Sequence, residues 1–196
     1  MKRTLLLLLM IILLCAPVSA MARRLYYAEE FYLYVLNLYY TNPNLERNIR
    51  FMQWALKAPF DNPVRSLALI TTENEFKRYK SLFRMHVNLL IIDSYLQLAR
   101  RFDKEHVYFF NLWYAQSLKE SFQIAKYYYT IGLNYWTEAL TNAQQGNGVP
   151  GRINIDEWED ELIQVLSGEL DYEVIINDHL EKLGIKMAAV EGALSK

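Results

Sequence analysis

The chain has 196 residues, of which 53% are hydrophobic, 14% aromatic and 22% charged, and its formal net charge is −1. This composition is typical of a folded globular protein and excludes a disordered chain, and the small net charge gives no general attraction to nucleic acid. Only seven glycines and five prolines interrupt the chain, which favours long helices over many short strands.

The first twenty residues resemble a secretory signal peptide. Lys2 and Arg3 precede an unbroken apolar run over 5–14, and small residues surround Ala20. The pattern predicts export to the periplasm or cell envelope, with residues 1–20 removed by cleavage after Ala20. Cleavage after Ala22 is the second choice.

Two alternatives stay open for this N-terminal segment. Residues 4–22 contain no charge and are long enough to be retained as a membrane anchor. Lipidation of Cys15 is the other alternative, although Leu14 departs from the small residue that precedes the cysteine of a bacterial lipobox. Cleavage after Ala20 would remove Cys15, the only cysteine, and leave a chain without disulfides or thiolate metal sites.

Four segments with apolar residues at helical spacing predict the main helices. They are residues 23–40, 45–58, 72–102 and 107–143. Pro59 follows the second segment and ends it, and Thr72 with Glu75 forms a capping-box pattern at the start of the third. We expect a break at 103–105. The fourth segment forms either one helix of about 55 Å or two helices with a turn at 119–121.

The end of the chain differs in composition from the rest. Residues 144–155 predict a linker, because the stretch is polar and holds three of the seven glycines. We expect two acidic helices beyond it, with Asp156 and Asp171 as their N-caps. Gly184 is expected to end or bend the second of these helices, and the tail that follows it is expected to be loosely held. The predicted organisation is a signal peptide over 1–20, an aromatic-rich helical domain over 21–143, the linker over 144–155 and an acidic helical pair over 156–196.

Charge is unevenly distributed along the chain. Residues 23–104 hold 13 basic and 8 acidic side chains, whereas residues 156–182 hold 10 acidic side chains and one basic one, Lys182. Both segments are interpreted either as solvated helix faces or as an acidic arm that faces a basic partner or a second copy of the chain.

No pattern of catalytic, cofactor-binding or metal-binding residues is found. His86, His106 and His179 lack the i, i+4 spacing of a helical metal pair, and the sequence has no HExxH, Gly-rich phosphate loop or GxSxG. We expect His86 on the flank of its helix and the other two at the surface. The prediction is therefore a protein without enzymatic activity, cofactor or metal; an enzyme would have to use groups such as His86, Glu75 and Asp93 in a site without a spacing signal.

Three consecutive tyrosines occupy positions 127–129. They span most of a helix circumference, so at least one must face away from the main core. Such a tyrosine is a candidate interface residue, and packing between helices is the alternative role for the group.

Residues 29–60 resemble a helical hairpin of the tetratricopeptide repeat (TPR) type. The residues that match are Tyr32, Val35 and Tyr39 in the first helix, Met52 and Ala55 in the second, and Pro59 near the closing position. Gly132, Trp136 and Ala139 repeat part of the second-helix pattern. Leu36 and Asn48 depart from it, and the long segments do not divide into 34-residue units. The resemblance implies an all-α fold of TPR-like antiparallel hairpins elaborated with long helices, plus a small C-terminal helical arm, and a scaffold that binds protein segments.

The overall design is also similar to that of exported, aromatic-rich, TPR-like proteins that build a collar around the periplasmic flagellar motor of spirochaetes. The expected function is an exported, non-catalytic scaffold for protein–protein interactions in a larger assembly. Its partners would be other envelope proteins or a second copy, with no nucleic acid and with membrane attachment only through the N-terminal segment. The alternative is a helical binding protein for a small apolar or aromatic ligand. The sequence does not identify the binding residues.

Overall fold

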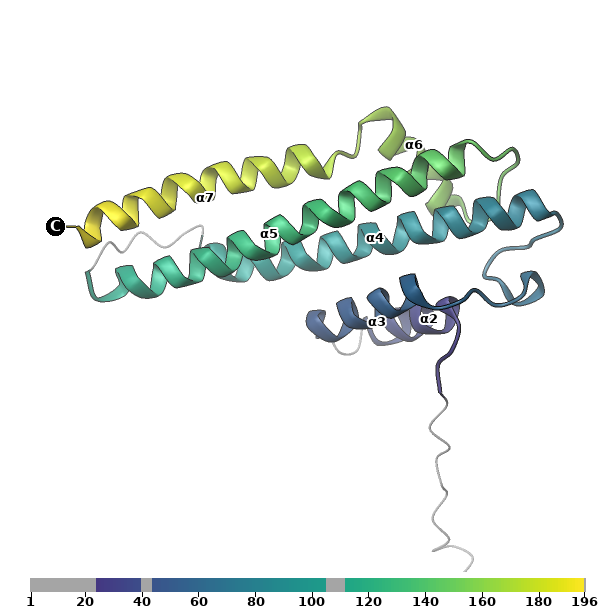
Figure 1. The fold of residues 1–196 in the computed structure, drawn as a ribbon, viewed down its shortest axis with the longest axis horizontal. Helices are drawn as coiled ribbons and strands as arrows, with labels where there is room; N and C mark the ends of the chain where they lie inside the picture. Colours follow the sequence, from purple (N-terminus) through teal and green to yellow (C-terminus); the bar gives the residue numbers. More distant parts are fainter. Residues whose placement is uncertain (1–23, 40–43, 105–111, 196) are drawn as a thin grey trace, which may run out of the picture.

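The computed structural model describes residues 24–39, 44–104 and 112–195 (Figure 1). Within these ranges the fold is all-α and contains no strand, which confirms the predicted fold class. The elements are α2 (Ala28–Tyr39), α3 (Leu45–Lys57), a 3₁₀ turn (Pro63–Arg65), α4 (Glu73–Asp103), α5 (Leu112–Asn147), α6 (Asp156–Ser167) and α7 (Tyr172–Leu194). None of the described helices is long and apolar enough to cross a membrane. The predicted signal peptide, Cys15 and His106 lie outside the described residues.

Two long antiparallel helices, α4 and α5, form the centre of the molecule. In Figure 1, α7 lies along α5 on one side of this pair, and the α2–α3 hairpin lies against α4 on the other side. The short helix α6 packs on α4 and α5 near the C-terminal end of α5. The C-terminal helices are therefore packed against the central pair.

The α2–α3 hairpin is closed by backbone and capping hydrogen bonds. Asn44 is the N-cap of α3 and its side chain accepts a hydrogen bond from the backbone N–H of Arg47. The backbone N–H of Ala28 donates to the carbonyl of Pro59 at 2.9 Å, which joins the start of α2 to the end of α3. The inward side chains of the hairpin are Tyr32 and Val35 of α2 and Met52 and Ala55 of α3, and all four are buried.

Helix α4 begins and ends as its sequence predicts. Thr72 and Glu75 form the complete capping box, and Lys104 ends the helix in the left-handed conformation with φ of 50°. Because α3, α5 and α6 each cover part of α4, most of its circumference is buried. The largest fully buried side chains of α4 are Tyr79, Leu82, Phe83, Met85, His86, Ile91 and Ile92.

Helix α5 is a single helix of 36 residues, about 54 Å long at 1.5 Å per residue. Residues 119–121 are helical, so the alternative with a turn there is wrong. The helix continues to Asn147, which makes the first residues of the expected linker helical. Gly132 allows α7 to approach closely, because a Cβ there would lie 3.0 Å from Cδ1 of Ile176.

The two C-terminal helices confirm one predicted N-cap and correct the other. Asp171 caps α7 as predicted, accepting hydrogen bonds from the N–H groups of Glu173 and Val174. Asp156 is not an N-cap, because α6 begins at Asp156 itself and the N-cap is Ile155, which has no side-chain acceptor. The predicted N-cap of α6 is therefore wrong.

The tail after Gly184 is helical and packed, which contradicts the expected loose end. Helix α7 runs to Leu194 because its apolar stripe continues through Leu183, Met187 and Val190 at helical spacing. Lys186 donates to Asp103 at 2.7 Å, and Glu191 lies 3.1 Å from Lys119 of α5. These contacts hold the last turns of α7 on α4 and α5.

Candidate functional site

Two places on the described part of the chain are candidates for a functional site. One is a polar cluster where α6 meets α4. The other is an aromatic surface on the outer side of the α2–α3 hairpin.

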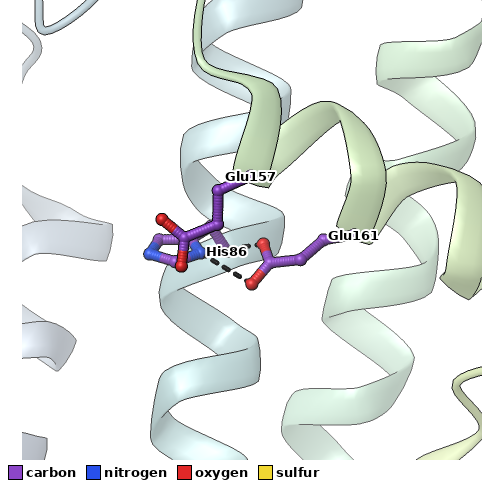
Figure 2. A group of neighbouring side chains, drawn as sticks. All are labelled: His86, Glu157 and Glu161. Carbon is purple, nitrogen blue, oxygen red and sulfur yellow. Dashed lines mark hydrogen bonds and ion pairs between the residues drawn. The ribbon is translucent and has the colours of Figure 1, made fainter.

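The polar cluster consists of His86, Glu157 and Glu161, and we call it the His86 cluster. One possible metal-ligand atom from each residue lies within 4.8 Å of those from the other two. Figure 2 shows the imidazole of α4 beside the two carboxylates of α6. Glu157 and Glu161 are four residues apart, so both side chains leave the same face of α6. The cluster thus depends on the packing of α6 against α4.

His86 is 2% exposed, which corrects the expectation that it lies on the flank of its helix. Its Nε2 lies 2.9 Å from the hydroxyl of Tyr32. Its Nδ1 lies 2.8 and 3.0 Å from the two carboxylate oxygens of Glu161. The imidazole stacks on Trp158 at a centroid distance of 5.2 Å, and Tyr32 meets it edge-on at 5.5 Å. The ring is therefore held on one face by Trp158 and at both nitrogens by Tyr32 and Glu161.

The His86 cluster is electronegative. Among the described residues, neither Glu157 nor Glu161 has a Lys or Arg partner. Burial raises the pKa of Tyr32 to about 12, and the negative charges of Glu157 and Glu161 contribute to the increase. A cation would therefore be favoured at this position.

A pocket of about 620 Å³ opens beside the cluster, between the α2–α3 hairpin, α4 and α6. His86 and Glu157 form part of its wall, and Asp93 lies farther along α4. Asp93 also accepts a short hydrogen bond from the hydroxyl of Tyr172. The apolar part of the lining consists of Val35, Leu36, Met52 and Leu90.

The second place is the aromatic face, which consists of Phe31 and Tyr34 of α2 and Phe51 and Trp54 of α3. Ring centroids are 4.6 Å apart for Tyr34 and Phe51, 5.0 Å for Phe51 and Trp54, and 5.9 Å for Phe31 and Trp54. Trp54 is 44% exposed and Tyr34 is 38% exposed. Together with Arg24 and Leu25, the four rings line an open hollow of about 640 Å³.

The three tyrosines at 127–129 divide as predicted. Tyr129 is buried and donates to Asp103 at 3.1 Å, while Tyr127 is 62% exposed. At least one of them therefore faces away from the core.

Glu75 belongs to the capping box of α4. His179 stacks on Tyr129 at a centroid distance of 5.0 Å and is partly buried, whereas a surface position was expected.

The sequence contained a signal for the His86 cluster that a search for histidine pairs misses. Glu157 and Glu161 have the i, i+4 spacing of two ligands on one helix face. The third donor, His86, is more than seventy residues away in the chain, so only the packing of α6 on α4 brings it to the pair.

One protein family matches this chain. Its model, described as a domain of unknown function (DUF8513), matches residues 74–193, which is more than half of the chain and spans α4 to α7. No curated protein and no solved structure matches. The His86 cluster lies inside the matched region, and the aromatic face precedes it.

Proposed function

The chain belongs to the DUF8513 family, and we propose that it is an exported, non-catalytic helical scaffold that joins a larger assembly of the cell envelope. The observation that supports this proposal best is the aromatic face. Export is supported by the signal-like pattern of residues 1–20. The flagellar collar of spirochaetes is one candidate assembly, on the resemblance alone.

The aromatic face has the properties of a binding surface. Its residues are offset by one position from the inward-facing residues of the same helices, so Phe31 and Phe51 precede the buried Tyr32 and Met52. Phe31 and Phe51 are partly buried and pack against the core, whereas Tyr34 and Trp54 remain exposed. Tryptophan and tyrosine at exposed positions contribute strongly to protein–protein binding, because they bury a large area at low entropic cost.

The charges around this face favour a particular kind of partner. Arg50, Trp54 and Lys57 lie on one exposed stripe of α3. An apolar protein segment flanked by acidic residues would complement this surface. The outer surface of the C-terminal helices has this chemistry, with exposed Ile163 and Val174 among acidic residues. A second copy of the chain therefore qualifies as a partner, as does another envelope protein of the same chemistry.

The proposal is tested by purifying the tagged protein from native envelopes after chemical crosslinking. Wild-type protein is compared with a Tyr34→Ser, Trp54→Ser double variant and with Val64→Ser, which removes an exposed apolar side chain elsewhere. We expect a reproducible set of partners, or a crosslinked dimer, with wild type and Val64→Ser and its loss with the double variant. Identical recovery from all three proteins, or recovery of the monomer alone, would contradict the proposal.

A second candidate function is the binding of a small molecule in the pocket beside the His86 cluster. The pocket has an apolar side with Val35 and Met52 and an acidic side with Asp93 and Glu157. This lining favours a ligand with an apolar body and a cationic group. Native mass spectrometry of freshly isolated protein tests it: a retained small molecule supports this function, and protein free of any ligand counts against it.

A further inference from the structure

We propose that His86, Glu157 and Glu161 form a binding site for a divalent transition-metal ion that links α6 to α4. The proposal does not depend on the scaffold function. It rests on the convergence of three donor groups from two helices, with one ligand atom of each within 4.8 Å of the others.

The donor set suits a first-row divalent ion. Imidazole nitrogen and carboxylate oxygen both coordinate Zn²⁺, at about 2.0–2.2 Å, and the same mixed set binds other ions of this class. Ligand atoms around such an ion are about 3–3.5 Å apart. The present separation of at most 4.8 Å therefore requires only small side-chain movements, which the exposed Glu157 can make.

The surroundings of His86 prepare it for this role. A metal-binding histidine commonly uses its second nitrogen to hold the ring in place. Here Tyr32 lies 2.9 Å from Nε2, so Nε2–H can donate to the hydroxyl oxygen while Nδ1 points toward α6. A bound ion would need the lone pair of Nδ1, and it would take the place of the present contact between Nδ1 and Glu161 at 2.8 Å.

The charge of the site also favours a cation. Two carboxylates lie close together without a Lys or Arg partner among the described residues. Glu157 is exposed and makes no hydrogen bond or ion pair among these residues, so its carboxylate can turn toward an ion. An ion pair between His86 and Glu161 would explain only two of the three groups.

The placement of the site suggests two consequences. Because Glu157 and Glu161 lie in the first turns of α6 and His86 lies midway along α4, a bound ion would join the two helices. His86 and Glu157 also line the 620 Å³ pocket, so the coordination positions that the protein leaves open would be available to water or to a ligand there.

Zn²⁺ is the probe for the test. Full-length protein without a polyhistidine tag is freed of metal with EDTA, dialysed and titrated with Zn²⁺ against a chromophoric chelator. The variants are Glu157→Gln and Glu161→Gln, and the control is Asp160→Asn, which neutralises an exposed carboxylate on the same helix outside the cluster. Circular dichroism checks that each variant keeps its helix content.

We expect wild type and Asp160→Asn to bind one equivalent with the same affinity and to gain thermal stability from Zn²⁺. Each glutamine variant should bind at least about tenfold more weakly and lose the thermal gain. Binding that is unchanged by Glu157→Gln would show an adventitious ion only, at another position, and would overturn the proposal. Absence of stoichiometric binding to wild type would overturn it as well.

Discussion

Arg78 of α4 and Glu159 of α6 form a buried bidentate ion pair between residues 81 positions apart in the chain. Nε and Nη2 of Arg78 donate to the two carboxylate oxygens at 2.9 and 2.5 Å. Nη1 donates to the carbonyls of Gly146 and Val149, where α5 ends. Glu159 also accepts a hydrogen bond from the N–H of Ile153. One arginine therefore joins α4, the end of α5 and α6.

Breaking this pair should be costly. Glu159→Gln would leave the Arg78 guanidinium buried without a counter-charge, and we expect the free energy of unfolding to fall by about 3 kcal/mol. Asp160→Asn, the exposed neighbour, should change it by less than about 0.5 kcal/mol. Urea unfolding at pH 7 measures both variants. Equal, small effects of the two substitutions would contradict a stabilising role for the pair.

The same carboxylate should contribute to acid sensitivity. Burial alone would raise the pKa of Glu159, but the hydrogen bonds from Arg78 and Ile153 and the charge of Arg78 outweigh it and lower the pKa below the ordinary 4.5. Since the folded state holds the proton less tightly than the unfolded state, this stabilisation is present above about pH 4.5 and is lost as pH falls through the lower folded value. The stability difference between wild type and Glu159→Gln should therefore shrink below about pH 4.5 in urea unfolding. A difference that is constant from pH 7 to pH 3 would contradict this.

His179 should make stability depend on pH in a higher range. Burial, and then the charge of Arg100, lower the pKa of His179 below its ordinary 6.5. The unfolded state then binds the proton more readily than the folded state, so this residue reduces stability as pH falls below about 6.5. Between pH 7.5 and 5.5, the free energy of unfolding should fall less for the His179→Gln variant than for wild type, as measured by urea unfolding. An equal or larger loss in the variant would show that His179 does not contribute.

The packed end of α7 can be tested with a pair of aspartate substitutions. Val190 is buried and Ala188 is exposed on the same helix. Val190→Asp places an unpaired charge in an apolar contact and should lower the free energy of unfolding by about 3 kcal/mol or more, whereas Ala188→Asp should have little effect. Thermal unfolding measures both. Equal melting temperatures would mean that the tail is not held in place.

Local sequence signals predicted much of the fold. The boundaries of α4 followed from Thr72, Glu75 and the expected break after Phe102, because capping is decided by neighbouring residues. The unbroken length of α5 was one of two alternatives, since periodicity does not show whether a polar stretch such as 119–121 turns.

Features that depend on distant partners were not predictable from local patterns. Glu159 belongs to an acidic run interpreted as a solvated face or an acidic arm, and it is buried only because Arg78 lies opposite. His86 appeared to lie on a helix flank because its cover, Tyr32 and Trp158, comes from other helices. Gly184 predicts an end or a bend of the last helix, but the apolar stripe of α7 continues to Val190 and keeps the tail helical and packed.

The most direct measurement of the proposed scaffold function uses a photocrosslinking amino acid at position 54, on the aromatic face. Tyr114, an exposed tyrosine on α5, is the matched control position. Irradiation of intact native cells should give a discrete, larger adduct from position 54 and none from position 114, and mass spectrometry would identify the partner or a second copy. A protein that is exported and folded but gives no adduct from position 54 would contradict binding through this face, and with it the proposed function.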